Sequence, residues 1–428
     1  MCTFIMSVPF YQIWTKLGYI RPDWIIGGVI IGMGIYYFAK GRPLYINLPI
    51  VLVLAFFLSV SISSANLFHE GNKVWVDFIT QYAQFTFVIL LFLSVAVIRL
   101  NHSEIEKIIS CWILFAALLS AYGLYQVFAI IFDLPLKHII YNNFFVENYQ
   151  STDLFVELRV RVTSVMAEPN DFARYIVPPL LCSLYSIGRR PNSIMPFKTD
   201  VYNVILISTM LSALALSFSM AGYITFLSVI IITLPFRQLR ILSWQNVSVV
   251  LVSFTLTLFT LSYTGITSAF GQATDRLTNI IYLQEAGGGS LGVRVEAIQE
   301  AINTGLKYPI LGSGFGLHSN IISSQVREGA YISNLWAGVF ARFGLIGLSV
   351  LISLFLYIVI YLYNKRSLFS VTSSLCSILL IILISDVVRS NASMNLLYPR
   401  LWFMLGISSA LLAQVSATSK ERVTTREP

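Results

Sequence analysis

The chain has 428 residues, of which 56% are hydrophobic and 11% are charged. Ordinary soluble domains carry roughly 25% charged residues, so this composition excludes a soluble globular protein, which would lack a polar surface. The formal net charge of +8 suits contact with anionic lipid headgroups, and the sequence offers no soluble basic domain for nucleic acid.

Apolar blocks recur along the chain, and each is long enough to cross a hydrocarbon layer of roughly 30 Å as a helix. The sequence therefore predicts an all-α polytopic membrane protein, with a single transmembrane domain over residues 1–428 and about eleven or twelve transmembrane helices. The first fourteen residues are apolar but short, so they form either a tight first span or an interfacial segment, and no signal-peptide cleavage site follows them. The clearer spans are residues 24–40, 44–64, 78–98, 108–131, 172–187, 201–217, 220–235, 246–264, 344–363, 371–388 and 399–415.

Basic residues predict which side of the membrane each connection faces, because short connections rich in Lys and Arg lie in the cytoplasm. By this bias five short connections and the C-terminal tail are cytoplasmic: those with Lys40 and Arg42, with Arg99 and Lys107, with Arg189, Arg190 and Lys198, with Arg237 and Arg240, with Lys365 and Arg366, and the tail with Lys420, Arg422 and Arg426. The remaining loops then face outward. Two of them, residues 132–171 and 265–343, are longer than a simple turn requires, and long connections without a domain of their own tend to be functional.

The first long loop, residues 132–171, carries Arg159 and Arg161 on the side that the charge bias disfavours. Apolar and polar residues alternate around them, which predicts an extended segment with both guanidinium groups on one side. The segment leads to Glu168 and then to a helix that begins near Pro169-Asn170, where proline suits the first turn. The two arginines either bind an anionic ligand on the outer face or reach toward lipid headgroups.

The second long loop, residues 265–343, contains a helical pattern. Val295, Ile298 and Ile302 recur at helical spacing, which predicts a helix over residues 291–306 that lies on the membrane or on the helix bundle. This loop also carries arginines on the disfavoured side, and the arginines of both loops together indicate an anionic ligand on the outer face.

A glycine-rich stretch follows this helix, Pro309-Ile-Leu-Gly312-Ser-Gly314-Phe-Gly316. Glycine at every second position lets the backbone approach a ligand or another helix closely. The stretch has no preceding strand and no Gly-Lys-Ser/Thr ending, so the sequence does not predict a nucleotide phosphate loop.

Three motifs carry a family resemblance. The first is Arg161-x-x-Ser164-x-Met166-x-x-Pro169-Asn170-x-x-Ala173. The second combines Arg294, Ala301, the glycine-rich stretch and Gly344-Leu-Ile-Gly347-Leu348. The third and weaker motif is Tyr398-Pro-Arg-Leu-Trp402-Phe-Met-Leu-Gly406. Together they lie within residues 150–415 and resemble the bacterial O-antigen polymerase and O-antigen ligase family, membrane glycosyltransferases that use undecaprenyl-diphosphate-linked sugars.

Some positions depart from the family pattern. Residues 217–219 read Ser-Phe-Ser where family members often carry Ser-Arg. Ser333-Asn334 stands where the ligases place a catalytic His followed by Asn, and Arg342 replaces an acidic residue that often precedes Gly344. The nearest histidine is His318, which either substitutes from another position or is a surface residue.

The resemblance implies transfer of a saccharide from undecaprenyl diphosphate to an acceptor hydroxyl. Arginine suits the leaving diphosphate, because its planar fork binds two phosphate oxygens and stays protonated. We expect Arg161 and Arg294 to form the catalytic clamp on the diphosphate, assisted by Arg159 and Arg342. Glu168 is the first candidate for the general base, although pairing with Arg161 explains it equally well.

Further residues are expected to bind substrate or to orient loops: Asn170, Asn334, His318, Gly312 and Gly314. The sequence predicts no cofactor and no metal site, because no cluster of Asp, Glu or His has ligand spacing. The expected partners are an undecaprenyl-diphosphate-linked oligosaccharide and membrane lipids, with a chain-length regulator as an open choice and no nucleic acid.

We therefore expect a polymerase of lipid-linked repeat units that acts on the periplasmic face of a bacterial inner membrane. An O-antigen ligase that transfers polymer to lipid A core is one alternative, although the absent histidine argues against an orthodox ligase. A polysaccharide transporter or flippase is another, and it would use polar residues within the spans, such as Gln81, Gln84 and the pair Asp386 and Arg389. An i,i+3 pair near a helix end is more often structural.

Overall fold

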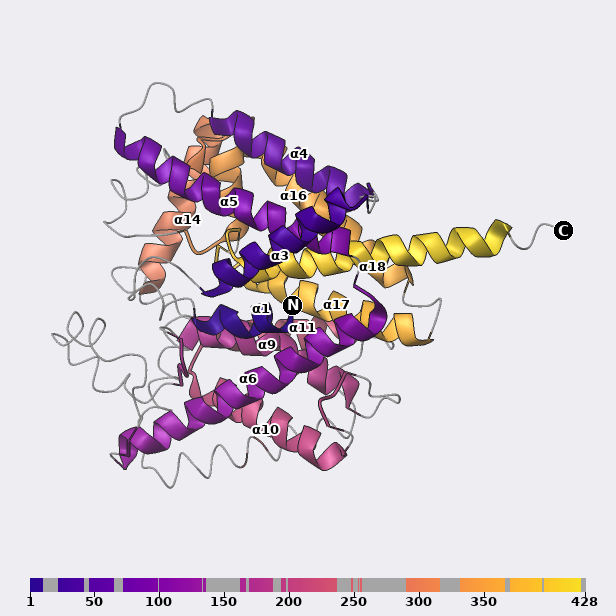
Figure 1. The fold of residues 1–428 in the computed structure, drawn as a ribbon. Coiled ribbons are helices and arrows are strands. Elements are labelled where there is room, and N and C mark those ends of the chain that lie inside the picture. Colours follow the sequence, from indigo (N-terminus) through magenta and orange to yellow (C-terminus); the bar gives the residue numbers. More distant parts are fainter. Residues whose placement is uncertain are drawn as a thin grey trace. The chain divides into compact units, whose positions relative to one another are not determined.

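The structure is a computed structural model that describes residues 1–10, 22–41, 46–64, 72–98, 100–132, 134–135, 162–166, 169–187, 194–197, 199–236, 248, 253, 255, 290–315, 332–365, 370–394 and 396–424. Within these residues the regular elements are helices and none is a strand (Figure 1). The chain groups into two compact units. Unit 1 comprises Met1–Ile26 and Ser103–Tyr282, and unit 2 comprises Gly27–His102 and Leu283–Pro428.

Unit 1 is organised around one buried helix. Its elements are α1 (Cys2–Ser7), η1 (Val8–Phe10), α6 (His102–Ile131), α9 (Pro169–Ser186), α10 (Asp200–Leu216) and α11 (Met220–Thr233). α9 contacts both α10 and α11, and most of its side chains are buried. The hydroxyl of Tyr175 on α9 donates a hydrogen bond of 2.9 Å to the carbonyl of Ile5, so α9 also anchors the N-terminal helix.

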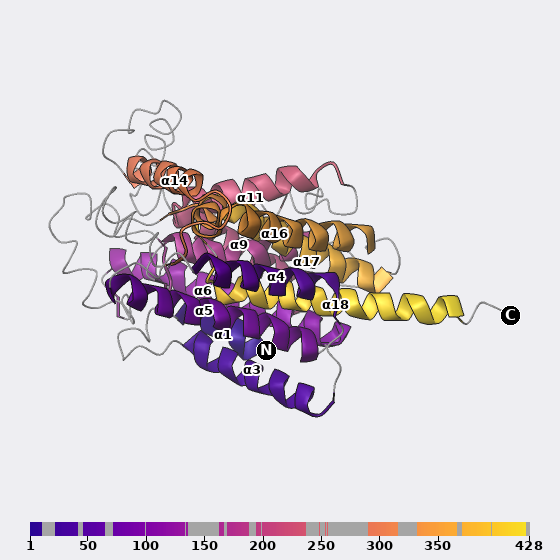
Figure 2. The ribbon, with the colours of Figure 1, turned by 90° about the horizontal axis from the view of Figure 1, so that it is seen from above.

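Unit 2 contains the remaining described helices. They are α4 (Leu48–Ser63), α5 (Asn72–Ile98), α14 (Ser290–Lys307), α16 (Leu335–Lys365), α17 (Ser370–Arg389) and α18 (Pro399–Thr424), and α3 (Pro22–Ala39) enters this unit from Gly27 onward. α5 packs on α18 and α4 packs on α16, while α17 contacts both α16 and α18. Helices α4, α5, α16, α17 and α18 run alongside one another (Figure 2).

Fully buried aromatic rings form the centre of unit 2. The ring of Phe56 on α4 meets the rings of Phe85 and Phe343 at centroid distances of 5.6 and 5.8 Å, both edge to face. The ring of Phe315 lies 4.9 Å from that of Phe343, and Trp402 stacks on Phe56 at 6.3 Å. Edge-to-face and offset arrangements are the favourable ones for aromatic pairs. The cluster therefore fixes the segment that carries Phe315 against α4, α5, α16 and α18.

The described helices overlap the predicted spans, but α16 begins at Leu335, inside the predicted loop 265–343 and before the predicted span 344–363. The predicted span 246–264 lies almost wholly outside the described residues. Among the described helices, 4 are long and apolar enough to cross a membrane, namely α3 and the apolar stretches of α5, α6 and α16. Shorter apolar helices are α4, α10 and α11. The predicted class, an all-α membrane protein, is confirmed.

α16 is interrupted at Gly344, whose φ of 62° and ψ of −163° are not helical. In an unbroken helix the N–H groups of Leu345 and Ile346 would donate to the carbonyls of Ala341 and Arg342. The interruption separates these donors from their acceptors. Unpaired backbone groups in a membrane-spanning segment cost several kcal/mol each, so other partners are required.

The glycine-rich stretch supplies those partners. Four backbone hydrogen bonds join it to α16: Leu345 N–H donates to Pro309 C=O at 2.8 Å, Ile346 N–H to Ile310 C=O at 3.3 Å, Ser313 N–H to Ala341 C=O at 2.9 Å, and Gly314 N–H to Arg342 C=O at 2.8 Å. Both donors and both acceptors released by the interruption are thereby paired again. The stretch completes a broken helix rather than lying on its surface.

Glycine is required on both sides of this junction. A Cβ on Gly344 would lie 2.3 Å from the carbonyl oxygen of Ile310, and one on Gly312 would lie 2.3 Å from the backbone of Arg342. Both residues also have positive φ, +62° and +72°, which side-chain-bearing residues rarely adopt. Of the two partners expected for the glycine-rich stretch, a ligand or another helix, the described contacts are with a helix.

α14 confirms the helix predicted over residues 291–306. It packs against α16 through small residues, because Ala297 and Ala301 are fully buried and a Cβ on Gly305 would lie 2.3 Å from the ring of Phe340. The expected apolar positions behave differently, since Ile302 remains 43% exposed. The small residues of α14, rather than its large apolar ones, therefore face the helix bundle.

Candidate functional site

The structure describes part of the predicted site. Four predicted residues lie outside the described part of the chain: Arg159, Arg161, Glu168 and His318. The expected proximity of Arg161 and Arg294 therefore stays a prediction. The other residues are Asn170 in unit 1 and, in unit 2, Arg294, Gly312, Gly314, Asn334 and Arg342.

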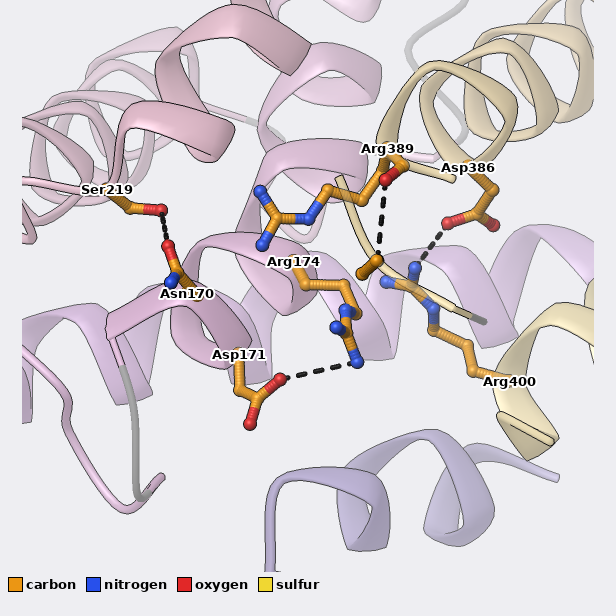
Figure 3. A network of polar contacts seen from close by, with 8 residues as sticks. Asn170, Asp171, Arg174, Ser219, Asp386, Arg389 and Arg400 are labelled. Atoms are coloured by element: carbon orange, nitrogen blue, oxygen red, sulfur yellow. Dashed lines mark hydrogen bonds and ion pairs between the residues drawn. The ribbon is translucent and has the colours of Figure 1, made fainter. Parts of the chain in front are cut away.

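In unit 1, Asn170 of the first motif contacts the turn between α10 and α11. Family members often carry an arginine in this turn. The hydroxyl of Ser219 donates a 2.7 Å hydrogen bond to Oδ1 of Asn170 (Figure 3). The Oγ atom of Ser219 also accepts the N–H of Gly222 at 3.2 Å and thereby caps α11. A Cβ on Gly222 would lie 2.6 Å from that of Ala173, so α11 approaches α9 closely here. Asn170 on α9 is thus hydrogen-bonded to the residue that caps α11, and its expected part in substrate binding stays a prediction.

The backbone beside this hydrogen bond is strained. Ser164 and Phe218 have φ values of +56° and +49°, an uncommon conformation for residues other than glycine. Val162, two residues before Ser164, donates its N–H to the carbonyl of Leu216 at 3.1 Å, which joins the two strained segments. Gln126 on α6 donates to the carbonyl of Ser164 at 3.0 Å and holds it in place. Strain of this kind persists where surrounding contacts enforce it, and it clusters at functional sites.

An ion pair on α9 lies next to Asn170. Nη1 of Arg174 is 3.3 Å from Oδ1 of Asp171, and the two side chains are 18% and 16% exposed (Figure 3). Our interpretation of the sequence did not single out either residue. The i,i+3 spacing on a helix is the signal that predicts the pair.

In unit 2 a second cluster of charges joins α17 to α18. The carboxylate of Asp386 forms an ion pair with Arg400 at the start of α18 (Figure 3). The guanidinium of Arg400 also lies 5.3 Å from the ring centroid of Tyr398. Asp386, Arg389 and Arg400 are 2%, 3% and 0% exposed, so two guanidinium groups and one carboxylate are buried at the adjoining helix ends. The ion pair therefore links α17 to α18.

The segment that precedes α16 is attached to this end of α17. The N–H of Leu335 donates to the carbonyl of Ser390 at 2.8 Å, and Nδ2 of Asn334 donates to the carbonyl of Asn391 at 3.3 Å. Oδ1 of Asn334 accepts the N–H of Ala337 at 3.0 Å, as a helix cap does. Asn334 therefore orients its segment, and Ser333 beside it is 3% exposed.

Arg342 lies two residues before the interruption of α16. Its guanidinium carbon is 5.5 Å from the ring centroid of Phe315, a cation–π distance, and its side chain is half-buried. Nε of Arg342 is buried and makes no hydrogen bond within the described residues. The carbonyl of Arg342 binds Gly314, so the predicted residues Arg342, Gly312 and Gly314 are brought together by the same junction.

The buried charge cluster of unit 2 contains two guanidinium groups and one carboxylate. Arginines buried in membrane-spanning segments are costly and mark ligand pathways more often than lipid contacts. A guanidinium fork binds phosphate oxygens in pairs, which a buried cluster with more arginines than carboxylates can exploit. Among the described residues, no group of three or more His, Cys, Asp and Glu side chains is arranged to hold a metal ion.

Comparison with known proteins gives one family match. Residues 205–352 match the profile of the O-antigen ligase family. No curated protein matches the chain. The matched residues include the interruption of α16, the glycine-rich stretch and six of the predicted site residues: Arg294, Gly312, Gly314, His318, Asn334 and Arg342. The match confirms the resemblance inferred from the motifs over residues 205–352, and the chain is an all-α membrane protein that resembles the O-antigen polymerase and ligase family.

Proposed function

We propose that the chain is a metal-independent membrane glycosyltransferase that polymerises undecaprenyl-diphosphate-linked repeat units on the periplasmic face of a bacterial inner membrane. The match of residues 205–352 to the O-antigen ligase family supports an O-antigen-related membrane enzyme, and Ser333 in the position of the ligase histidine favours a polymerase within that family. The product would be an O-antigen or a related surface polysaccharide. A chain-length regulator is a partner that such a polymerase would use.

The reaction joins the acceptor oxygen to the anomeric carbon of the donor sugar and breaks the bond from that carbon to the diphosphate. Undecaprenyl diphosphate leaves with the bonding electrons. Fixed guanidinium groups stabilise the developing charge where water is scarce, and Arg161 and Arg294 are the residues we assign to this clamp. Arg159 and Arg342 assist them. Asn170 and Asn334 keep the adjoining segments in register, as their hydrogen bonds to Ser219 and Asn391 support.

A general base must also accept the proton of the acceptor hydroxyl. We assign this role to Glu168, which follows the arginine-bearing segment in the sequence. Ser333 occupies the position of the ligase histidine, and a serine hydroxyl does not act as a base near neutral pH. The hydroxyl then attacks late, as the bond to diphosphate breaks, so that positioning contributes more than deprotonation.

The test uses the purified full-length protein in lipid nanodiscs with undecaprenyl-diphosphate-linked repeat units as the sole sugar substrate. A polymerase gives a ladder of longer lipid-linked products. No ladder, but transfer as soon as a core-type acceptor is added, would assign the protein to the ligases. Movement of intact lipid-linked units across sealed vesicles without any new glycosidic bond would assign it to the flippases.

The arginine assignment is tested separately. Arg161→Lys and Arg294→Lys keep the charge but lose the two parallel hydrogen bonds of the guanidinium fork, so each variant should make far less polymer than the wild type. Lys307→Arg is a matched control on the exposed end of α14, because it also exchanges the two basic types. Wild-type ladders from both arginine variants, at equal protein levels, would mean that these arginines do not contact the diphosphate.

A ligase is the second candidate, since the matching family is described by ligase activity. In that reading the same clamp would hold the donor, and the acceptor would be the lipid A core. Because Ser333 stands where the ligases place a catalytic histidine, we favour the polymerase.

A further inference from the structure

Three different faces of α14 are distinguishable by burial. The first face, called the small face here, consists of small residues such as Ala297 and Ala301 and is buried against α16. A polar face is exposed and consists of Glu296, Gln299, Asn303 and Lys307. The third face is apolar and also exposed: Val295 is 55%, Ile302 is 43% and Leu306 is 66% accessible. Successive members of this third face are seven and four residues apart, so they lie along one edge of the helix.

The exposed apolar edge continues beyond the end of α14. Ile310 is 62% exposed, and its carbonyl accepts the N–H of Ile346, which is itself 43% exposed. Leu345 beside it is 55% exposed. The apolar edge of α14 therefore runs through the glycine-rich stretch directly onto the second half of α16.

The second half of α16 carries the surface expected of a helix that faces lipid. Ile352, Leu356 and Ile360 recur every four residues and are 37%, 54% and 55% exposed. α16 is also one of the helices long and apolar enough to cross a membrane. In such a helix, exposed large apolar side chains contact the hydrocarbon chains of the bilayer.

The direction of α14 differs from that of the other helices of unit 2. Figure 1 shows it at a steep angle to α18 and α5, whereas Figure 2 shows α4, α5 and α16 to α18 running alongside one another. A helix that runs at a steep angle to the membrane-crossing helices is oriented closer to the plane of the membrane than to the membrane normal. Its exposed apolar edge beside an exposed polar face is the pattern of an interfacial helix.

We propose that α14 is an interfacial helix whose edge of Val295, Ile302 and Leu306 is inserted among the lipid chains of the outward leaflet. Its small face is clamped on the first half of α16, its polar face meets water, and its apolar edge extends the lipid-facing surface of α16. This arrangement fixes the depth of Arg294, which lies seven residues before Ala301 and so on the same side of the helix. A lipid-linked diphosphate lies at the same depth, in the headgroup layer.

The insertion does not rest on the proposed function, and its test does not use activity. The full-length chain is prepared with its four native cysteines replaced and with one new cysteine at a time, at Val295, Ile302 or Leu306. Gln299, Asn303 and Lys307 are the matched positions on the polar face of the same helix. Each variant is spin-labelled, reconstituted in lipid nanodiscs and measured for collision with oxygen, which concentrates in lipid, and with a water-soluble nickel chelate. A label at Leu356 on α16 gives the lipid reference.

The expected result is an alternation along one helix. Labels at Val295, Ile302 and Leu306 should collide more with oxygen than with the chelate, as the label at Leu356 does. Labels on the polar face should show the reverse order. Greater collision with the chelate at all six positions would overturn the proposal, because α14 would then lie in water. Shielding of the apolar edge from both reagents would also overturn it, since a second copy or another protein would cover that edge.

Discussion

Two ion pairs of the described residues are made in different ways. Asp171 and Arg174 lie three residues apart on α9 and remain partly exposed, at 16% and 18%. Asp386 and Arg400 lie on consecutive helices, and their side chains are 2% and 1% exposed. The first pair follows from the helix period alone. The second exists only because the ends of α17 and α18 are brought together, and neither charge can reach water.

Hydrogen bonds that stabilise the backbone differ in the same way, since some are local and others join distant segments. The cap of α11 by Ser219 is local, because donor and acceptor are three residues apart. The repair of α16 by the glycine-rich stretch joins residues 28 positions apart, such as Gly314 and Arg342, or 36 positions apart, such as Pro309 and Leu345. Local contacts can form in a separate helix, whereas the distant ones need the completed bundle. Substitutions should therefore cost more at the distant contacts.

The largest effect is expected at the buried ion pair. Arg400→Met leaves the carboxylate of Asp386 buried without its partner, which costs about 3–5 kcal/mol. Replacing both residues, with Asp386→Leu in the same chain, should recover most of this loss, because two apolar side chains carry no desolvation penalty. The measurement is thermal unfolding of the purified protein in detergent, followed by tryptophan fluorescence. A double variant no more stable than Arg400→Met would show that the pair is not the source of the effect.

The next effect is expected at the interruption of α16. Gly344→Ala requires a positive φ in a residue with a side chain and forces its Cβ against the carbonyl of Ile310, so a loss of about 2–4 kcal/mol is expected from strain and weakened hydrogen bonds. Gly28→Ala on α3 is the control, because a Cβ there meets nothing within 4 Å. Equal unfolding temperatures for the two variants would contradict the junction described for α16.

A smaller effect is expected at the cap of α11. Ser219→Ala removes both the cap of Gly222 and the hydrogen bond to Asn170, which together contribute about 1–2 kcal/mol. Ser349→Ala removes a serine that only bonds its own helix and should change stability little. If both substitutions lower the unfolding temperature equally, Ser219 has no special role in joining α11 to α9.

The smallest effect is expected at the local ion pair. Asp171→Asn should cost about 0.2–0.5 kcal/mol, because partly exposed pairs one helical turn apart contribute little. A double-mutant cycle with Arg174→Gln isolates the interaction between the two side chains. A coupling energy as large as that of Asp386 and Arg400 would remove the contrast between local and distant pairs.

The sequence by itself determined the class of the molecule. Apolar blocks of sufficient length predict membrane helices because a hydrocarbon layer demands internal hydrogen bonding, and this holds whatever the neighbours of each helix are. Helical spacing likewise predicted α14, and motif spacing indicated the family that residues 205–352 match. Each of these inferences needs only the order of residues within one segment.

Only the tertiary structure decided which residues meet. The partner of Asp386 is Arg400, on the next helix, although Arg389 is nearer in sequence. Glycine spacing showed that Gly312 permits a close approach, but not that the approaching segment is the broken part of α16. Helical spacing also could not tell which side of α14 faces the bundle, because Val295 and Ile302 are as apolar as core residues and the small Ala301 packs more closely. Such contacts depend on the shapes of two surfaces, and one segment of sequence describes only one of them.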